Sequence, residues 1–303
     1  MTGETTPQPM PDYMKPGARY TMSIEPARTM RTAALDWDYE IEVALPASYH
    51  VTPEKHYPVL WVTDGNWMFQ LAVGLLNVLV MGGLAPEMIV VGVGCPAAAG
   101  AAEWARRRRI DFYPPGKTPY WEGPGSDYVA SSLGVMEGPR QADDFLGFLV
   151  DELRPALARA YRMDGDHGLM GHSGGGMFAS YALFARPGAF RRYIIGSPSS
   201  NASDKAAFRL EAAYSAANKD FKANVFFGAG EREIGQLLPA AMGLASSAIL
   251  MAETLLVRRY PSLKLTTRIF PGKDHVNVIP DVISEGISAV WADQLDATRR
   301  PFG

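Results

Sequence analysis

The segment that most constrains the fold is LMGHSGGGMFA, residues 169–179, in which four glycines surround a single serine, Ser173. Glycines permit backbone angles and close approaches that other residues resist, so this cluster predicts a sharp, crowded turn. A strand-like run precedes the turn and a helix-like run follows it, which is the setting in which G-x-S-x-G forms a nucleophile elbow. Ser173 is therefore the candidate nucleophile. The alternative is a glycine-rich turn with an incidental serine.

Runs of strand length alternate with helical segments along the chain. The expected strands are 58–63, 88–93, 167–172, 192–197, 223–229 and 263–270, and the expected helices are 66–81, 141–161, 174–185, 238–259 and 281–297. Such alternation indicates βαβ units, and continuous apolar strands suit a sheet covered on both faces. Two alternating runs near 18–24 and 38–46 predict an antiparallel pair. The predicted class is α/β, with a doubly wound, mostly parallel sheet, an antiparallel N-terminal strand pair and helices on both faces.

The composition favours one large domain. The chain has 303 residues, of which 47% are hydrophobic and 20% are charged, a balance typical of a globular core. We expect residues 1–18 to form a flexible arm and residues 19–303 to form a single domain. The segment at about 95–140 is rich in Gly, Pro, Arg and aromatic residues, and its length predicts an insertion or lid over the active face.

Charge and targeting signals limit the expected partners. Lys and Arg total 29 against 32 Asp and Glu, so no basic field attracts nucleic acid and a small molecule is the expected partner. The apolar stretch 71–85 is too short and too interrupted for a membrane span. The N-terminus lacks a secretory signal, and Cys95 is the only cysteine, so we expect a cytoplasmic protein without a membrane partner. The sequence leaves open whether the chain forms a homo-oligomer.

A serine hydroxyl is a weak nucleophile until a base takes its proton. In the elbow fold the chain order is serine, acid, histidine, so the base should follow Ser173. Of the five histidines only His275 does so, in the loop FPGKDHVNVIP after the expected strand 263–270. We identify His275 as the candidate base; the alternative is a surface loop histidine.

The acid that orients the imidazole should follow the preceding strand. The segment ANVFFGAGERE offers Glu231 and Glu233, and its glycines predict an immediate turn that carries Glu231 to the edge of the sheet. We choose Glu231. Glu233 remains the alternative, unless it is a solvated carboxylate at a helix start. Asp274 adjoins the histidine and would have difficulty reaching its ring.

Two backbone N–H groups are candidates for an oxyanion hole. Gly174 follows the nucleophile at a helix start, and the turn after 58–63 offers Asn66, with Gly65 second. An ordinary Asp-Gly turn is the alternative for the latter pair.

Trp67 and Phe69 are candidates for an apolar substrate pocket, with core packing as the alternative. Arg109, in the run 106–109, is a candidate contact for an anionic or phenolic substrate, although a solvated loop paired with Asp111 and Glu103 is the competing interpretation. Zinc-ligand spacings are absent from the sequence, and we expect neither a metal nor an organic cofactor.

Five segments of the chain, taken in order, resemble segments of the esterase family of the α/β-hydrolase superfamily. Members of that family include siderophore esterases and feruloyl esterases. The resemblance is carried by YPVLWVTDG, DDFLGFLVDELRPALARAYR, GHSGGGMFASYALFARPGAFRRYIIGSPS, GAGE and FPGKDHVNVIP. It implies a serine esterase with Ser173 as nucleophile, Glu231 as acid and His275 as base. Glutamate in G-x-x-E is similar to the siderophore-esterase branch.

The expected function is hydrolysis of a carboxylic ester through an acyl-enzyme on Ser173, with a siderophore-type or aryl or acyl ester as substrate. Two alternatives remain. An acyltransferase would use the same triad with an alcohol in place of water, and a catalytically silent binding module would lack a triad member. The sequence does not specify the natural ester.

Overall fold

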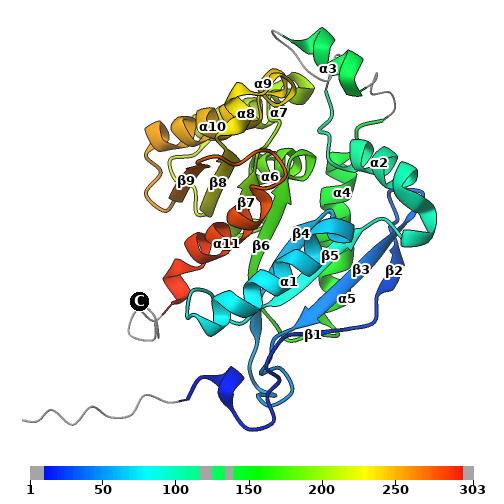
Figure 1. Ribbon diagram of the computed structural model, residues 1–303, viewed down its shortest axis with the longest axis vertical. Helices are drawn as coiled ribbons and strands as arrows, with labels where there is room; N and C mark the ends of the chain where they lie inside the picture. The colour runs from blue at the N-terminus through cyan, green and yellow to red at the C-terminus, as the bar shows by residue number, and fades with distance from the viewer. Residues whose placement is uncertain (1–9, 117–124, 134–138, 296–303) are drawn as a thin grey trace, which may run out of the picture.

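The computed structural model describes residues 10–116, 125–133 and 139–295. Within these residues nine strands form one sheet in the order β1-β3-β5-β4-β6-β7-β8-β9, with β2 also paired to β3 (Figure 1). The strands are β1 (Ser23–Ile24), β2 (Arg28–Arg31), β3 (Asp38–Leu45), β4 (Tyr57–Thr63), β5 (Ile89–Gly94), β6 (Met163–His172), β7 (Arg192–Gly196), β8 (Asn224–Gly230) and β9 (Lys264–Phe270).

The sheet is parallel from β5 to β9 and antiparallel where β1, β2 and β5 meet β3. In its centre Leu169 of β6 pairs with Trp61 of β4 on one side and Tyr193 of β7 on the other. The predicted fold class is therefore confirmed, including the antiparallel N-terminal strands. Parallel neighbours require crossover connections, and the helices between the strands supply them.

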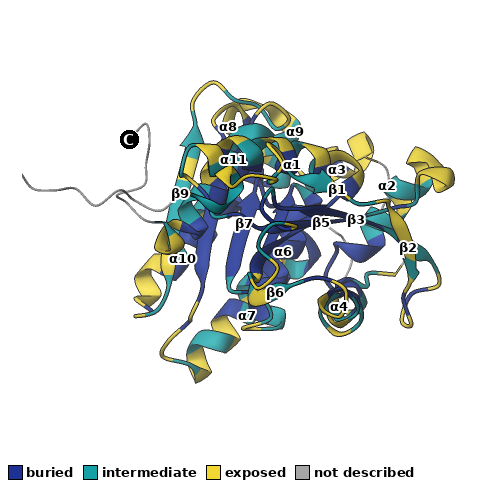
Figure 2. Ribbon diagram, turned by 90° about the horizontal axis from the view of Figure 1, so that it is seen from below, coloured by how far each residue is buried: buried dark blue, intermediate teal, exposed yellow. Residues whose placement is uncertain are grey.

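Helices cover both faces of the sheet. They are α1 (Gly65–Met81), α2 (Gly100–Asp111), α3 (Ser126–Leu133), α4 (Ala142–Gly147), α5 (Arg154–Ala158), α6 (Gly174–Ala185), α7 (Ala202–Ala217), α8 (Arg232–Gly235), α9 (Leu237–Met242), α10 (Leu244–Arg258) and α11 (Ile279–Val290). Helices α1 and α11 pack on one face, and α4, α6 and α10 lie on the other (Figures 1 and 2). The inner strands β4, β5, β7 and β8 are buried almost throughout. Strands β2 and β9, at the two ends of the sheet, are exposed or half-buried, as Figure 2 shows.

Each face of the sheet has its own apolar core, because side chains alternate along a strand. On the α1 and α11 side Leu60 and Val62 of β4 pack with Phe69. On the other side Val59 and Trp61 of the same strand pack with Phe178. Burial on both faces explains why these strands are apolar without a polar alternation.

Some expected elements differ from the observed ones. The helix expected at 141–161 is α4 and α5 joined by a π-helical segment, Phe148–Leu153. The helix expected at 238–259 is divided into α9 and α10 at Gly243, whose φ is 69°. The stretch Leu237–Arg258 is long and apolar enough for a membrane span by composition alone. However, the stretch is divided into two helices, and α10 packs on β8 and β9, as expected of a helix that covers the core of a folded domain.

The expected arm and insertion fall partly outside the described residues, which exclude 1–9, 117–124 and 134–138. In the described part of the arm, Asp12 forms an ion pair with Lys55 at 2.8 Å. The insertion contains α2 and α3. A flexible arm at residues 1–18, a single domain at 19–303 and a lid at about 95–140 therefore stay predictions.

The glycines around Ser173 are required by close backbone contacts. A Cβ built on Gly171 would lie 2.1 Å from the carbonyl oxygen of Gly175, and one on Gly176 would lie 2.3 Å from that of Gly196. Neither backbone oxygen can move without disturbing β7 or α6. The turn from β6 into α6 therefore closes only because these positions lack side chains.

Gly176→Ala is expected to reduce the free energy of unfolding by about 3 kcal/mol, because the new methyl group overlaps a backbone oxygen. Gly74→Ala is the matched control, since Gly74 lies on α1 with no atom within 4 Å of its Cβ position. It should stabilise the chain by up to about 1 kcal/mol through helix propensity. Urea unfolding of both variants tests the expectation; equal stabilities would contradict it.

Candidate active site

The candidate site lies where strands of the parallel sheet end, which is where open α/β sheets place their ligands. Asp64 follows β4, Ser173 follows β6 and Ser197 follows β7. Glu233 lies just beyond β8 on α8, and His275 lies in the loop after β9. Five separate loops thus meet at one edge of the sheet.

Ser173 has a strained backbone. Its φ is 58° and its ψ is −120°, outside the ordinary range for a residue with a side chain, and it precedes the first residue of α6. Its N–H donates to the carbonyl of Gly196 at 2.9 Å. Such strain costs on the order of 1–3 kcal/mol and persists only when the surroundings impose it. The conformation is the one expected of a nucleophile elbow.

His275 is joined to a carboxylate by a side-chain hydrogen bond. Its Nδ1 lies 3.0 Å from Oε1 of Glu233, and Glu233 is completely buried. The same oxygen accepts a hydrogen bond from the hydroxyl of Ser197 at 2.7 Å. A bond from Nδ1 to a carboxylate fixes the orientation of the ring and leaves Nε2 for proton transfer.

The choice of Glu231 as the carboxylate beside His275 is wrong. Its Oε2 accepts a hydrogen bond from the N–H of Gly272 at 2.8 Å, and its side chain is exposed. The backbone N–H groups of Glu231 and Arg232 bind the carbonyls of Phe270 and Lys273, so the chain follows the loop after β9 for two residues before it turns inward. This brings Glu233, the alternative acid, to the ring. Asp274 instead caps its own loop, through the N–H groups of Val276 and Asn277.

His172, immediately before Ser173, anchors the loop of His275. Its Nε2 lies 2.8 Å from the backbone carbonyl of His275, and because a carbonyl only accepts, Nε2 carries the proton. The two rings lie 4.7 Å apart between centroids. Burial, together with the nearby His275 and Arg108, lowers the pKa of His172 to about 3. His172 is therefore a neutral donor near pH 7.

Arg108 of α2, which belongs to the run 106–109 but is not the residue chosen from it, is a charged group at the site. Its Nε lies 2.8 and 3.0 Å from the two carboxylate oxygens of Asp64. Burial opposes its charge, but the charge and hydrogen bonds of Asp64 leave the pKa of the guanidinium above its usual value. A Cβ on Gly174 would lie 2.9 Å from Nη1 of Arg108, so the cation lies directly over the first residue of α6.

The predicted Arg109 is half-buried on the same helix and forms no ion pair among the described residues. Its neighbours Arg106 and Arg107 pair with Glu103, as the alternative expects, but they do so on a helix rather than a loop, and Asp111 is buried instead of pairing with the run. Successive residues on a helix point in different directions, so only one arginine of the run reaches the elbow.

The candidate oxyanion donors Gly174 and Asn66 both lie at helix starts, Gly174 as the first residue of α6 and Asn66 as the second of α1. The side-chain amide of Asn66 makes two hydrogen bonds to the backbone of Cys95, at 2.7 and 2.8 Å. These bonds connect the ends of β4 and β5. The first N–H groups of a helix have no partner within the helix, so both turns can offer a donor.

The two candidate pocket residues have different surroundings. Trp67 is 64% exposed and its ring lies 6.0 Å from that of Trp104. Both rings line a cleft of about 180 Å³ that also includes Asn66 and Cys95. Phe69 is fully buried among the core residues of the α1 face, so its prediction as a pocket wall is wrong. Only Trp67 is available to a ligand.

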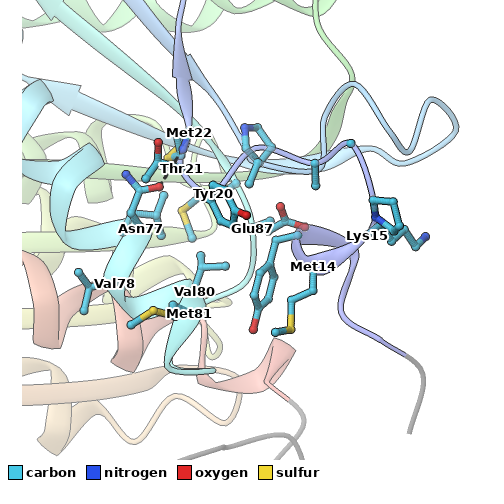
Figure 3. Close-up of a pocket in the computed structure, with 18 residues that line it drawn as sticks. Met14, Lys15, Tyr20, Thr21, Met22, Asn77, Val78, Val80, Met81 and Glu87 are labelled. Carbon is cyan, nitrogen blue, oxygen red and sulfur yellow. Dashed lines mark hydrogen bonds between the residues drawn. The ribbon is translucent and has the colours of Figure 1, made fainter.

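A larger cavity, of about 640 Å³, lies at the other end of α1 (Figure 3). Its walls include Met14, Tyr20 and Met22 of the N-terminal segment and Asn77 and Met81 of α1. The candidate site uses the first residues of α1, and this cavity uses its last two turns, so they are separate. The cavity has no nucleophile with a neighbouring base among its described lining residues.

Among the described residues no group of three or more His, Cys, Asp and Glu side chains is arranged to hold a metal ion.

The sheet topology, the strained serine at an elbow and the imidazole with its carboxylate define a protein of the α/β-hydrolase class. Residues 32–241 match the family described as Putative esterase, and the chain belongs to this family. It is therefore an ester-hydrolysing enzyme.

Individual relatives agree with this class. The chain is 25% identical over 278 residues to the ferri-bacillibactin esterase BesA of Bacillus subtilis (strain 168), covering 88% of this chain and 90% of that protein. It is 31% identical over 166 residues to the siderophore triacetylfusarinine C esterase of Aspergillus fumigatus, covering 53% and 51%. The crystal structure of the BES protein from Bacillus cereus superposes with a TM-score of 0.71 at 26% identity, covering 88% and 94%.

The lowered pKa of His172 predicts a pH-dependent stability. Between pH 6.5 and about 3 the unfolded chain binds a proton at this residue that the folded chain does not, so the free energy of unfolding falls as the pH falls. His172→Gln should reduce this slope by up to about 1.4 kcal/mol per pH unit. Urea unfolding at about pH 6 and about pH 4.5 measures the slope.

His56→Gln, at an exposed histidine, is the matched control and should keep the wild-type slope. An unchanged slope in His172→Gln would contradict the assignment of a buried neutral imidazole.

Proposed function

We propose that this enzyme is a serine carboxylic-ester hydrolase that forms an acyl-enzyme on Ser173. The observation that supports this proposal most strongly is the 3.0 Å hydrogen bond between His275 and the buried Glu233, at the sheet edge where the strained Ser173 also lies. A buried carboxylate that orients an imidazole is the arrangement that activates a serine hydroxyl.

In the first half-reaction, Nε2 of His275 takes the proton of the Ser173 hydroxyl as Oγ attacks the ester carbonyl carbon. Glu233 stabilises the imidazolium that forms. The tetrahedral intermediate then collapses, the bond to the alcohol oxygen breaks, and His275 protonates the leaving alcohol. In the second half-reaction water attacks the acyl-enzyme by the same route, which releases the acid and restores Ser173.

The backbone N–H groups of Gly174 and Asn66 are the proposed donors to the oxyanion. The guanidinium of Arg108, held over Gly174 by Asp64, adds a positive charge beside the place where negative charge develops. Fixed donors and charges of this kind act without reorganisation during the reaction. The removal of one oxyanion donor typically lowers kcat about 10²- to 10³-fold.

The proposed substrate is an aryl or siderophore-type ester. Trp67 and Trp104 offer two aromatic faces in a cleft that begins at Asn66, one residue beyond the start of α1. Indole rings bind planar apolar groups, and the nearby Arg108 suits an acyl or aryl group with anionic character. The names of two relatives point in the same direction: BesA is named a ferri-bacillibactin esterase, and the fungal relative a siderophore triacetylfusarinine C esterase. A cytoplasmic location, and the absence of nucleic-acid and membrane partners, stay predictions.

Ser173→Ala should lower kcat/KM for p-nitrophenyl esters by more than about 10³-fold, because it removes the nucleophile. Glu233→Gln should lower it by about 10²- to 10⁴-fold, because the amide cannot stabilise the imidazolium. Glu231→Gln is the matched control and should remain within about twofold of wild type. Steady-state kinetics test all three.

A large loss in Glu231→Gln with little change in Glu233→Gln would contradict the assignment of the acid. Full activity in Ser173→Ala would contradict the proposed mechanism.

Trp67→Ala should raise KM for aryl esters about tenfold and leave KM for a short alkyl ester within about twofold, because it removes one aromatic wall of the cleft. Phe69→Leu is the comparison variant; it lies in the core and should affect stability rather than the ratio of the two KM values. The two substrates are compared on each variant. An equal change of KM for both substrates in Trp67→Ala would refute an aryl-binding role.

A further inference from the structure

Ser197, in the segment GSPS after β7, has no role in the mechanism above, yet its side chain points at the catalytic carboxylate. Its hydroxyl donates to Oε1 of Glu233 at 2.7 Å. Ser197 is completely buried, and its N–H donates to the carbonyl of Gly228 at 2.8 Å. The hydroxyl therefore approaches Glu233 from a rigid strand end.

The backbone of Ser197 is also strained, with a φ of 42°. Positive φ is uncommon for residues with a side chain, and it is maintained only where neighbouring contacts enforce it. Here the bond to Gly228 on β8 holds the turn, so the hydroxyl and the start of the acid loop are fixed against the same strand. The strain is thus coupled to the direction of the hydroxyl.

Glu233 depends on few partners. Its Oε1 accepts from both Ser197 and His275, whereas its Oε2 is buried without a hydrogen-bond partner among the described residues. A buried carboxylate is unfavourable unless hydrogen bonds stabilise its charge. Without Ser197, His275 would be the only side chain bonded to it, and the carboxylate could turn about its last torsion away from the ring.

We propose that Ser197 is a positioning residue that holds the carboxylate of Glu233 in the orientation that His275 requires. This inference rests on the proposed function and deepens it. Ser197 acts on the reaction only through Glu233, which in turn orients the imidazole of His275.

A purely structural role is the competing explanation, since a buried hydroxyl needs a partner. The chain does not follow that requirement strictly, because the buried hydroxyls of Ser180 and Ser247 have no hydrogen-bond partner among the described residues. A buried serine is therefore tolerated without a partner elsewhere in this fold. Ser247, on α10, supplies the control substitution.

The test is a double-mutant cycle on the full chain with a p-nitrophenyl ester. Ser197→Ala should lower kcat about 10- to 100-fold, in line with the loss of a hydrogen bond to a charged group, and leave KM within about twofold. In a Glu233→Gln background the same substitution should change kcat less than about twofold, because the group through which it acts is already disabled. Ser247→Ala should match wild type.

Ser197→Gly provides a second variant that removes the hydroxyl and tolerates the positive φ, so it should fold even where alanine does not. It should reproduce the loss in kcat. Wild-type kcat in either folded variant would overturn the inference, as would a rise in KM or an equal loss of kcat in the Glu233→Gln background. If the wild-type chain shows no turnover that depends on Ser173, the proposed function fails and this inference fails with it. If turnover depends on Ser173 but Ser197→Ala keeps the wild-type kcat, the proposed function stands and only the positioning role of Ser197 fails.

Discussion

The candidate site depends on one interaction: a carboxylate fully removed from water forms a hydrogen bond with the imidazole of His275. That bond is part of a ring of contacts. Ser197 donates to Glu233, His172 donates to the backbone of His275, and the N–H of Ser173 binds the residue before Ser197. Each group is held by another that follows a different strand. The ring holds the imidazole of His275 against Glu233 on one side and against His172, the residue before the elbow serine, on the other.

The parallel sheet makes this ring possible, because the carboxyl ends of its strands meet at one edge. The short loops that leave this edge carry the strain at Asp64, Ser173 and Ser197, all of which have positive φ. Buried strands that are apolar on both faces stabilise the sheet enough to support such strain. The strained residues at the edge of the sheet thus depend on the stability of its buried core.

Much of the fold could be predicted from the sequence, because the signals are local. Apolar runs gave the strands of the sheet, and the glycines around Ser173 indicated the turn before any contact was known. The carboxylate beside His275 was harder to predict. Glu231 and Glu233 differ only in how far the chain follows the loop after β9, and the backbone hydrogen bonds to Phe270 and Lys273 decide that distance.

Tertiary contacts also determined the other differences. Arg108, rather than Arg109, reaches the elbow, where it pairs with Asp64 of another loop. Phe69 and Trp67 lie two residues apart on α1, yet one enters the core and the other is exposed. A helix position alone does not decide this, since the direction of the apolar face depends on the partner strands. The residues around Ser197 in the sequence do not indicate its proposed role, because that role depends on contacts with β8 and α8, which are distant in the chain.

Covalent labelling of the folded chain with a fluorophosphonate, followed by peptide mass spectrometry, tests directly whether Ser173 is an activated nucleophile. An activated Ser173 should give one adduct per chain, on Ser173, which forms on the folded protein and is lost on prior denaturation. A folded chain that stays unlabelled, or that is labelled on another serine with Ser173 unmodified, would contradict this prediction.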